Sequence, residues 1–113
     1  MAIRTLYIAP DGSFDTVTLE TTPALDPGPG EITVRLRASS LNYHDLGVVS
    51  GAMGPTARRI PMSDGAGEVT AVGEGVREFA VGDHVASTFF PDWLDGEPQA
   101  EGFARTLGDG IDG

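Results

Sequence analysis

The sequence predicts a mainly β fold, a small barrel-like domain with one short helix. Two stretches carry this prediction. Residues 31–39 alternate apolar with polar side chains, which is the period of a strand with one face in the core and one in water. Residues 68–72 alternate in the same way, and Gly73 and Gly75 end this predicted strand. A tight loop then leads to a second apolar strand over Val85–Phe90. A chain of 113 residues suits a single domain of this kind.

The N-terminal part is predicted to hold a hairpin followed by a connector. Arg4–Ala9 and Phe14–Leu19 are short apolar runs, and Pro10-Asp11-Gly12 between them is a strong turn signal. Thr22–Gly30 contains three prolines and two glycines, which excludes a helix or a central strand. We therefore expect a β-hairpin and an extended connector before the strand over residues 31–39.

One short helix of one or two turns is expected to begin after Asn42. Asn42 is a helix-capping residue type, and Asp45, three residues later, is placed to bind back to the cap and to favour the positive end of the helix. Ser50–Pro61 is rich in glycine and proline and is predicted to be an exposed loop. Pro91–Pro98 is predicted to be loop again, and Leu107–Gly113 shows no packing pattern.

The chain is strongly acidic and contains no lysine. Its 17 acidic residues stand against seven arginines, for a formal charge of -10, and residues 92–113 hold six of the acids and one of the arginines. The basic surface that nucleic-acid binding needs is missing, so no nucleic-acid partner is expected. We interpret the acidic C-terminal part as a solvated surface that keeps the protein soluble.

Cysteine is absent, which excludes disulfides, zinc sites built on thiolates and a cysteine nucleophile. No apolar run is long enough to span a membrane, and residues 1–12 lack the apolar core of a signal peptide. We therefore expect a cytoplasmic protein without a membrane partner.

Four segments between residues 27 and 90 carry a further signal, because they follow one another at the spacing of a known family. They are Pro27–Glu31 before the strand, Ser40–Asp45 with Val49–Gly51 behind it, Ile60–Val69, and Val72–Val85. With all four in order, the chain resembles the N-terminal GroES-like domain of the medium-chain dehydrogenase/reductase superfamily. Within that superfamily it is most similar to the zinc-free quinone oxidoreductase and alcohol dehydrogenase-like branch. The resemblance implies a GroES-like, partly open barrel.

Two positions separate this sequence from the zinc-dependent members that it resembles. Those members place a metal-binding cysteine where Asn42 stands and a metal-binding histidine where Ser63 stands, and they insert a four-cysteine lobe near residues 91–102. An amide and a hydroxyl are poor ligands for zinc. We therefore expect no zinc and assign no metal ligand.

The resemblance implies a nicotinamide cofactor, NAD or NADP, that binds mainly outside this stretch of sequence. Relatives hold it on a following doubly wound domain, and no strand, GxGxxG turn and helix follow one another in these 113 residues. In relatives a stretch like Gly108–Gly113 leads into a further strand of the barrel. We expect residues 1–113 to be the substrate-side domain of a longer enzyme, without its closing strands and cofactor domain, and inactive alone.

The implied reaction is hydride transfer from the nicotinamide to a small-molecule carbonyl, enone or quinone substrate. Without zinc, a protein group must donate a hydrogen bond to the oxygen on which charge develops, and Tyr43 and His44 are the candidate catalytic residues. Asn42 and Ser63 stand at the positions of metal ligands in relatives. They are the candidate cofactor contacts and are expected to face the cleft.

Three aromatic residues near the end of the last predicted strand are candidate walls of the substrate site: Phe89, Phe90 and Trp93. A plain packing role is the alternative for each. The other candidates also have structural alternatives: Asn42 as a helix cap, His44 as a solvated or capping residue on a surface helix, and Tyr43 as core filler. Asp64 is expected to be a buried carboxylate that holds the backbone of residues 65–67.

Two other functions stay open. Residues 67–75 and 81–85 also resemble the chaperonin-10 cofactor, an oligomeric binding protein, although that cofactor lacks segments like Asn42–Asp45 and Ser63–Val69. A zinc-independent enoyl reductase unit of a larger synthase would differ from the first interpretation only in its substrate. Missing closing strands would leave an open sheet edge, so a homo-oligomer is expected.

Overall fold

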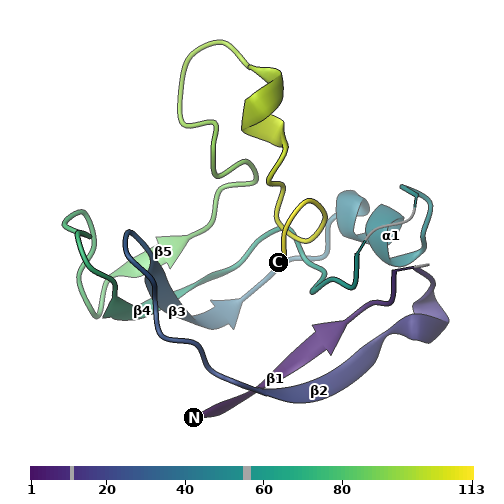
Figure 1. The fold of residues 1–113 in the computed structure, drawn as a ribbon, viewed down its shortest axis with the longest axis horizontal. Helices are drawn as coiled ribbons and strands as arrows, with labels where there is room; N and C mark the ends of the chain where they lie inside the picture. Colours follow the sequence, from purple (N-terminus) through teal and green to yellow (C-terminus); the bar gives the residue numbers. More distant parts are fainter. Residues whose placement is uncertain (11, 55–56) are drawn as a thin grey trace.

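Two antiparallel sheets and one short α-helix form the fold (Figure 1). The structure is a computed structural model that describes residues 1–10, 12–54 and 57–113. The first sheet pairs β1 (Ala2–Tyr7) with β2 (Thr18–Pro23), and the second has the order β3 (Ile32–Ala38), β4 (Ala66–Val72), β5 (His84–Ala86). The helix is α1 (Tyr43–Val49), and two 3-10 helices cover Phe14–Thr16 and Ala100–Phe103. This is the predicted fold class, mainly β with one helix.

The predicted N-terminal hairpin forms, with a longer connection than expected. β1 and β2 pair antiparallel along their full length. Phe14–Thr16, predicted as strand, is instead a 3-10 turn, because Thr16 Oγ1 donates to Ser13 O at 2.8 Å and draws the chain back on itself. β2 continues to Pro23, into the stretch predicted as connector. The predicted turn includes Asp11, which lies outside the described residues.

The strand predicted over residues 31–39 is β3, but its apolar face is not a closed core. Ile32 and Val34 are half-buried, whereas Leu36 is 63% exposed and Ala38 is exposed as well. Two register shifts interrupt the pairing of β3 with β4, and the face borders an open groove of about 500 Å³. The expectation that the whole face is buried is therefore wrong for its C-terminal half.

β4 lies at the centre of its sheet, and β5 is shorter than predicted. Val69 in β4 is fully buried. The strand predicted over Val85–Phe90 ends at Ala86, opposite Ala66, the first residue of β4, and a single further backbone hydrogen bond from Ser87 N to Gly65 O at 2.9 Å follows. The chain then leaves the sheet as an arm that carries the 3-10 helix Ala100–Phe103 (Figure 1).

The predicted helix forms where its capping residues place it. α1 starts directly after Asn42 and spans seven residues, and the Asn42 backbone N–H donates to Asp45 Oδ2 at 2.9 Å. Within the described ranges, no helix has the length and apolar character that a membrane span requires.

The segment Ser50–Pro61, predicted to be an exposed loop, is exposed only in part. Ile8 and Arg59 exchange backbone hydrogen bonds of 2.8 and 3.1 Å, and Pro61 is buried. Residues 55–56 of this predicted loop lie outside the described residues. The attachment at Ile8 fixes the N-terminal hairpin to the segment that leads into β4.

The C-terminal residues 107–113, for which no packing was predicted, fold back on the segment before β4 (Figure 1). Gly113 N donates to Ile60 O at 2.9 Å. Gly108 has a φ of 75° and lies so close to the Met62 backbone that a Cβ would clash with the Met62 carbonyl oxygen. We call residues 107–113 the C-terminal loop; its backbone is attached to the fold, and Asp112 remains exposed, as the interpretation of the acidic C-terminal part as solvated surface requires.

Candidate functional site

A small pocket lies where the start of α1, the segment before β4 and the segment after β5 meet. It has a volume of about 400 Å³, and its lining residues are Asn42, His44, Ser63, Asp64, Ser87 and Phe89. We call it the polar pocket. The structure thus brings together four of the candidate site residues, Asn42, His44, Ser63 and Phe89, and also Asp64, for which a structural role was expected.

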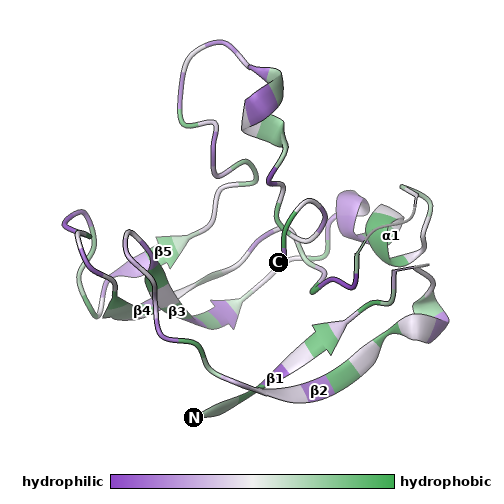
Figure 2. Ribbon diagram, viewed as in Figure 1, coloured by the Kyte–Doolittle hydropathy of each residue, from purple (hydrophilic) through white to green (hydrophobic). Residues whose placement is uncertain are grey.

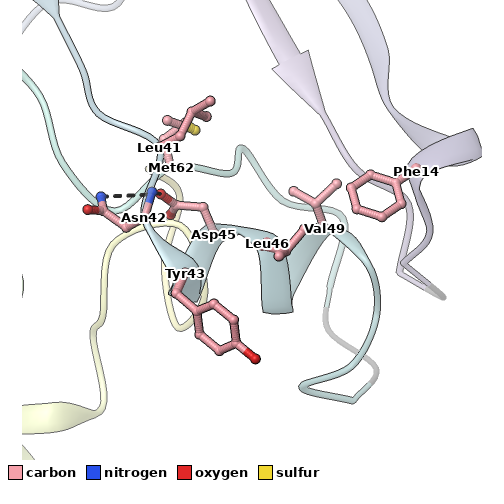
Figure 3. Close-up of a pocket in the computed structure, with 8 residues that line it drawn as sticks. All are labelled: Phe14, Leu41, Asn42, Tyr43, Asp45, Leu46, Val49 and Met62. Carbon is pink, nitrogen blue, oxygen red and sulfur yellow. Dashed lines mark hydrogen bonds between the residues drawn. The ribbon is translucent and has the colours of Figure 1, made fainter.

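The Asn42 side chain links the two sides of the polar pocket. Its Nδ2 donates to Ser63 Oγ at 3.3 Å and to Asp64 Oδ2 at 3.1 Å. It also lies 3.3 Å from Asp45 Oδ2, the contact drawn in Figure 3. Asp45 Oδ2 accepts from both the Asn42 backbone and the Asn42 amide, so Asn42 belongs to the capping box of α1 as well as to the pocket.

Asp64 collects hydrogen bonds from the loop that precedes α1. Its carboxylate accepts from Ser40 N at 2.8 Å, from Ser40 Oγ, from Asn42 Nδ2 and from Ser39 Oγ at 3.1 Å. These donors, the Ser40 backbone N–H above all, hold the pKa of Asp64 far below its usual range. Its partners are residues 39–42, not the backbone of residues 65–67 as predicted. Asp64 therefore ties the end of β3 to the segment that leads into β4.

His44 has its imidazole ring between two carboxylates. The side chain is 19% exposed, with Nε2 3.4 Å from Asp109 Oδ2 and Nδ1 3.9 Å from Asp45 Oδ1. Phe89 meets the ring edge-on, with ring centroids 5.1 Å apart. The expectation of a solvated side chain on a surface helix is thus wrong for His44.

Asp109 is a site residue that sequence reasoning missed. Its sequence signal is an acidic residue between Gly108 and Gly110, which is typical of a turn and carries no functional meaning by itself. The folding of the C-terminal loop onto Met62 brings its carboxylate to His44.

Tyr43 lies outside the polar pocket. Its side chain is 89% exposed and borders a separate apolar groove of about 520 Å³, lined mainly by Phe14, Leu41, Leu46, Val49 and Met62. In Figure 3 its ring points away from the Asn42 amide. The alternative role as core filler is excluded by this exposure, and His44 and Tyr43 do not share one site.

The three predicted wall residues separate into two groups. Phe89 lines the polar pocket, whereas Phe90 and Trp93 pack with Phe103 in an aromatic cluster, with ring centroids 4.7 and 5.7 Å from that of Phe103. The rings of Phe89 and Phe90 are in contact, with centroids 4.6 Å apart, and so connect the polar pocket with the aromatic cluster. The cluster thus supports the pocket wall from behind, and its member Phe103 was not singled out in the sequence.

The side chains that line the polar pocket are an imidazole, an amide, two hydroxyls, a carboxylate and an aromatic ring. In the part of the chain that the structure describes, no group of three or more His, Cys, Asp or Glu side chains is placed to hold a metal ion. The polar pocket offers the Asn42 amide and the hydroxyls of Ser63 and Ser87 to a small polar ring. No glycine-rich turn among the described residues leads into a helix, the arrangement in which a dinucleotide pyrophosphate binds.

Comparisons with known proteins agree on one family. The family model of the alcohol dehydrogenase GroES-like domain matches residues 28–111. A zinc-type alcohol dehydrogenase-like protein of Schizosaccharomyces pombe is 43% identical over 88 residues, which cover 75% of this chain and 25% of that protein. The chain therefore spans about a quarter of the length of this relative.

Two solved structures show the same fold. A putative alcohol dehydrogenase from Sinorhizobium meliloti superposes with a TM-score of 0.80 at 35% identity, covering 100% of this chain and 35% of that one. The Escherichia coli quinone oxidoreductase complexed with NADPH superposes with a TM-score of 0.68 at 26% identity, covering 74% of this chain and 26% of that one. The described residues thus correspond to one part of larger proteins.

Proposed function

The chain belongs to the alcohol dehydrogenase GroES-like domain family of the medium-chain dehydrogenase/reductases, and from this membership we propose that it forms the substrate side of a nicotinamide-dependent oxidoreductase. The observation that carries the proposal is the polar pocket, where a proton donor, an amide and a hydroxyl meet beside an aromatic ring. Reduced nicotinamide supplies a hydride when it is bound. The substrate, a carbonyl compound, enone or quinone, takes up that hydride together with one proton.

His44 is the proposed source of that proton. Its imidazole lines the pocket, and an N–H of the ring donates to the substrate oxygen as negative charge develops there. The pocket excludes much of the water around the ring, which strengthens such a hydrogen bond. Tyr43, the other predicted donor, is the less favoured one because it borders the separate apolar groove.

Asn42 and Ser63 are the proposed contacts to the nicotinamide end of the cofactor. Both line the polar pocket, and their hydrogen bond fixes the orientation of the amide. Phe89 is the proposed wall of the substrate site, supported by Phe90 and Trp93. The dinucleotide itself, NAD or NADP, is proposed to bind mainly to a part of the enzyme outside residues 1–113.

We propose that the reaction runs without zinc. Asn42 and Ser63 present an amide and a hydroxyl to each other, and Asn42 also donates to the carboxylate of Asp64. Of the side chains that line the polar pocket, only the His44 imidazole and the Asp64 carboxylate are of a type that zinc prefers, which is fewer than the three protein ligands of a catalytic zinc site. Charge on the substrate oxygen is then stabilised by a hydrogen-bond donor, which is the role proposed for His44.

A chimera tests this proposal. Residues 1–113 replace the equivalent part of the S. meliloti protein, which the chain matches over 100% of its own length. We expect a folded chimera to reduce quinones, enones or carbonyl compounds with NADH or NADPH, and His44→Gln to lower kcat about 100-fold because the acid is lost. His84→Gln, in exposed β5, is the matched control and should leave kcat unchanged.

Three outcomes would contradict the proposal. A folded chimera without reductase activity would remove the proposed function, and unchanged kcat in His44→Gln would assign the proton to another group. The 113-residue chain alone is expected to give no heat or fluorescence change with NADPH. Micromolar binding would contradict the proposal that the cofactor binds mainly to a part of the enzyme outside residues 1–113. A ring of seven copies would instead support the chaperonin-10-like alternative.

A further inference from the structure

His44 is contacted by carboxylates from two distant parts of the chain, and we propose that Asp109 is a positioning residue that holds the imidazole of His44 in the polar pocket. Asp109 lies on the C-terminal loop, while His44 lies in the first turn of α1. The contact itself is independent of the proposed function. Its catalytic consequence rests on the proposed role of His44 as proton donor.

The first argument is the pairing of ring nitrogens with carboxylate oxygens. Nε2 faces Asp109 Oδ2 at 3.4 Å, and Nδ1 faces Asp45 Oδ1 at 3.9 Å. In the described structure, Nδ1 and Asp45 Oδ1 are both buried without a hydrogen-bond partner, 3.9 Å apart. A ring that carries a hydrogen on both nitrogens directs one N–H toward each carboxylate, whereas a ring with one N–H turns a lone pair toward one of them.

The second argument is that the two carboxylates differ in what else they do. Asp45 is 4% exposed, and its Oδ2 already caps the Asn42 backbone, so its position is set by the helix. Asp109 has a side chain that is 35% exposed, and its Oδ2 lies 3.4 Å from His44 Nε2. The orientation of the ring relative to the pocket therefore depends on Asp109.

The third argument is that the loop carrying Asp109 is firmly placed. Gly108 packs against the Met62 backbone, and Gly113 N donates to Ile60 O at 2.9 Å. Asp109 N donates to Thr106 O at 3.3 Å, and Thr106 is 8% exposed. A loop held at both ends presents its side chain in one direction, which is what positioning requires.

The remaining neighbours of the ring are consistent with this role. Phe89 covers one edge of the imidazole, and Asp64 lies across the polar pocket with its carboxylate occupied by Ser40 and Asn42. The Nε2–Oδ2 distance of 3.4 Å is longer than that of a strong hydrogen bond, so a bound oxygen atom that comes closer to Nε2 can compete with Asp109 for the N–H. Asp109 thus orients the His44 ring and leaves its N–H available to the substrate oxygen.

Imidazole nitrogen NMR on the 113-residue chain tests the contact directly. The chain has two histidines, so His84→Gln assigns the His44 signals. We expect Asp109→Asn to change the His44 nitrogen shifts and leave those of His84 unchanged. Asp95→Asn, at an exposed position of the same acidic part, is the matched control and should change neither. Unchanged His44 shifts in a folded Asp109→Asn variant would overturn the inference.

A reciprocal variant covers the case in which Asp109→Asn does not fold. In His44→Gln, the side-chain carboxyl carbon signal of Asp109 is expected to shift, while that of Asp95 stays in place. An unmoved Asp109 signal would equally overturn the inference. Either spectrum reports on the contact without any cofactor.

Kinetics of the chimera separate this inference from the proposed function. Asp109→Asn is expected to lower kcat roughly tenfold with KM unchanged, because the donor is misoriented while substrate binding is kept. Asp109→Glu, which keeps the carboxylate, should recover part of kcat. An inactive chimera with the expected NMR shifts would contradict the function alone. An active chimera with unchanged kcat and unchanged shifts would contradict the inference alone.

Discussion

The Asp64 carboxylate accepts hydrogen bonds from Ser39, from Ser40 and from the Asn42 amide. These bonds join the loop before α1 to the segment before β4. The donors favour the ionised carboxylate, which is why the pKa of Asp64 lies below its ordinary value of 3.8. A carboxyl whose folded pKa is depressed stabilises the fold above its ordinary pKa, and it loses that contribution as the pH falls toward the folded value.

The pH dependence of stability tests this role of Asp64. Asp64→Asn is expected to lower Tm at pH 7, because an amide places N–H groups against the donors of Ser40 and Asn42. The difference from the unsubstituted chain should shrink as the pH falls below about 4, where the carboxylate becomes protonated in the unfolded chain. Thermal unfolding followed by circular dichroism measures both. Asp95→Asn is the control, and a Tm difference that stays constant down to pH 2 would refute the assignment.

Among the elements of the fold, the C-terminal loop helps to position the residues of the site, as the strands do. It brings Asp109 to His44 and attaches the chain end to the segment before β4. The strands of the second sheet place Asp64 and Phe89 on one side of the polar pocket, while α1 places His44 on the other. The polar pocket therefore depends on the docking of the helix and the sheet, and the loop adds the contact between Asp109 and His44.

Two glycines test the docking of the loop. Gly108 and Gly96 have nearly equal φ values, 75° and 76°, but a Cβ at Gly108 would clash with Met62 whereas one at Gly96 would meet open space. Gly96→Ala is expected to cost about 1 kcal/mol for the left-handed backbone alone. Gly108→Ala should cost about 2 kcal/mol more, because the loop must move away from Met62. Urea unfolding measures both, and equal costs would show that the loop is not docked as described.

At the scale of the whole molecule, apolar surface remains uncovered on both sheets. Figure 2 shows hydrophobic bands along the hairpin of β1 and β2, where Ile3, Leu6 and Leu19 are about half exposed. On the other sheet, Leu36 is 63% exposed beside the open groove. Open strand edges and exposed apolar faces both favour association with another chain.

Self-association is therefore expected for the 113-residue chain. Light scattering coupled to size-exclusion chromatography should show a mass that rises above that of the monomer with concentration. Leu36→Glu should lower the association, because it places a charge on the apolar face, whereas Leu25→Glu, at a position that is 82% exposed in the connector, should not. A mass equal to the monomer at every concentration would rule out the predicted homo-oligomer.

Much of the fold could be predicted because its signals are local. The alternation over residues 31–39 predicts β3, and the spacing of Asn42 and Asp45 predicts the start of α1. The length of β5 could not be predicted, because a strand ends where its partner ends and not where its own apolar run ends. The exposure of Leu36 could not be predicted from the alternation either, because burial depends on what covers the sheet.

By itself the sequence determined the mainly β class, the helix start, the family and the set of polar candidates around Asn42 and Ser63. Tertiary structure alone decided that His44 lies in the pocket and Tyr43 outside it, and that Asp109 reaches His44. The physical reason is the range of the interactions. Periodicity and capping act over a few residues, whereas the meeting of Asp109 with His44 depends on a glycine-rich loop whose backbone angles are fixed only by packing against distant residues.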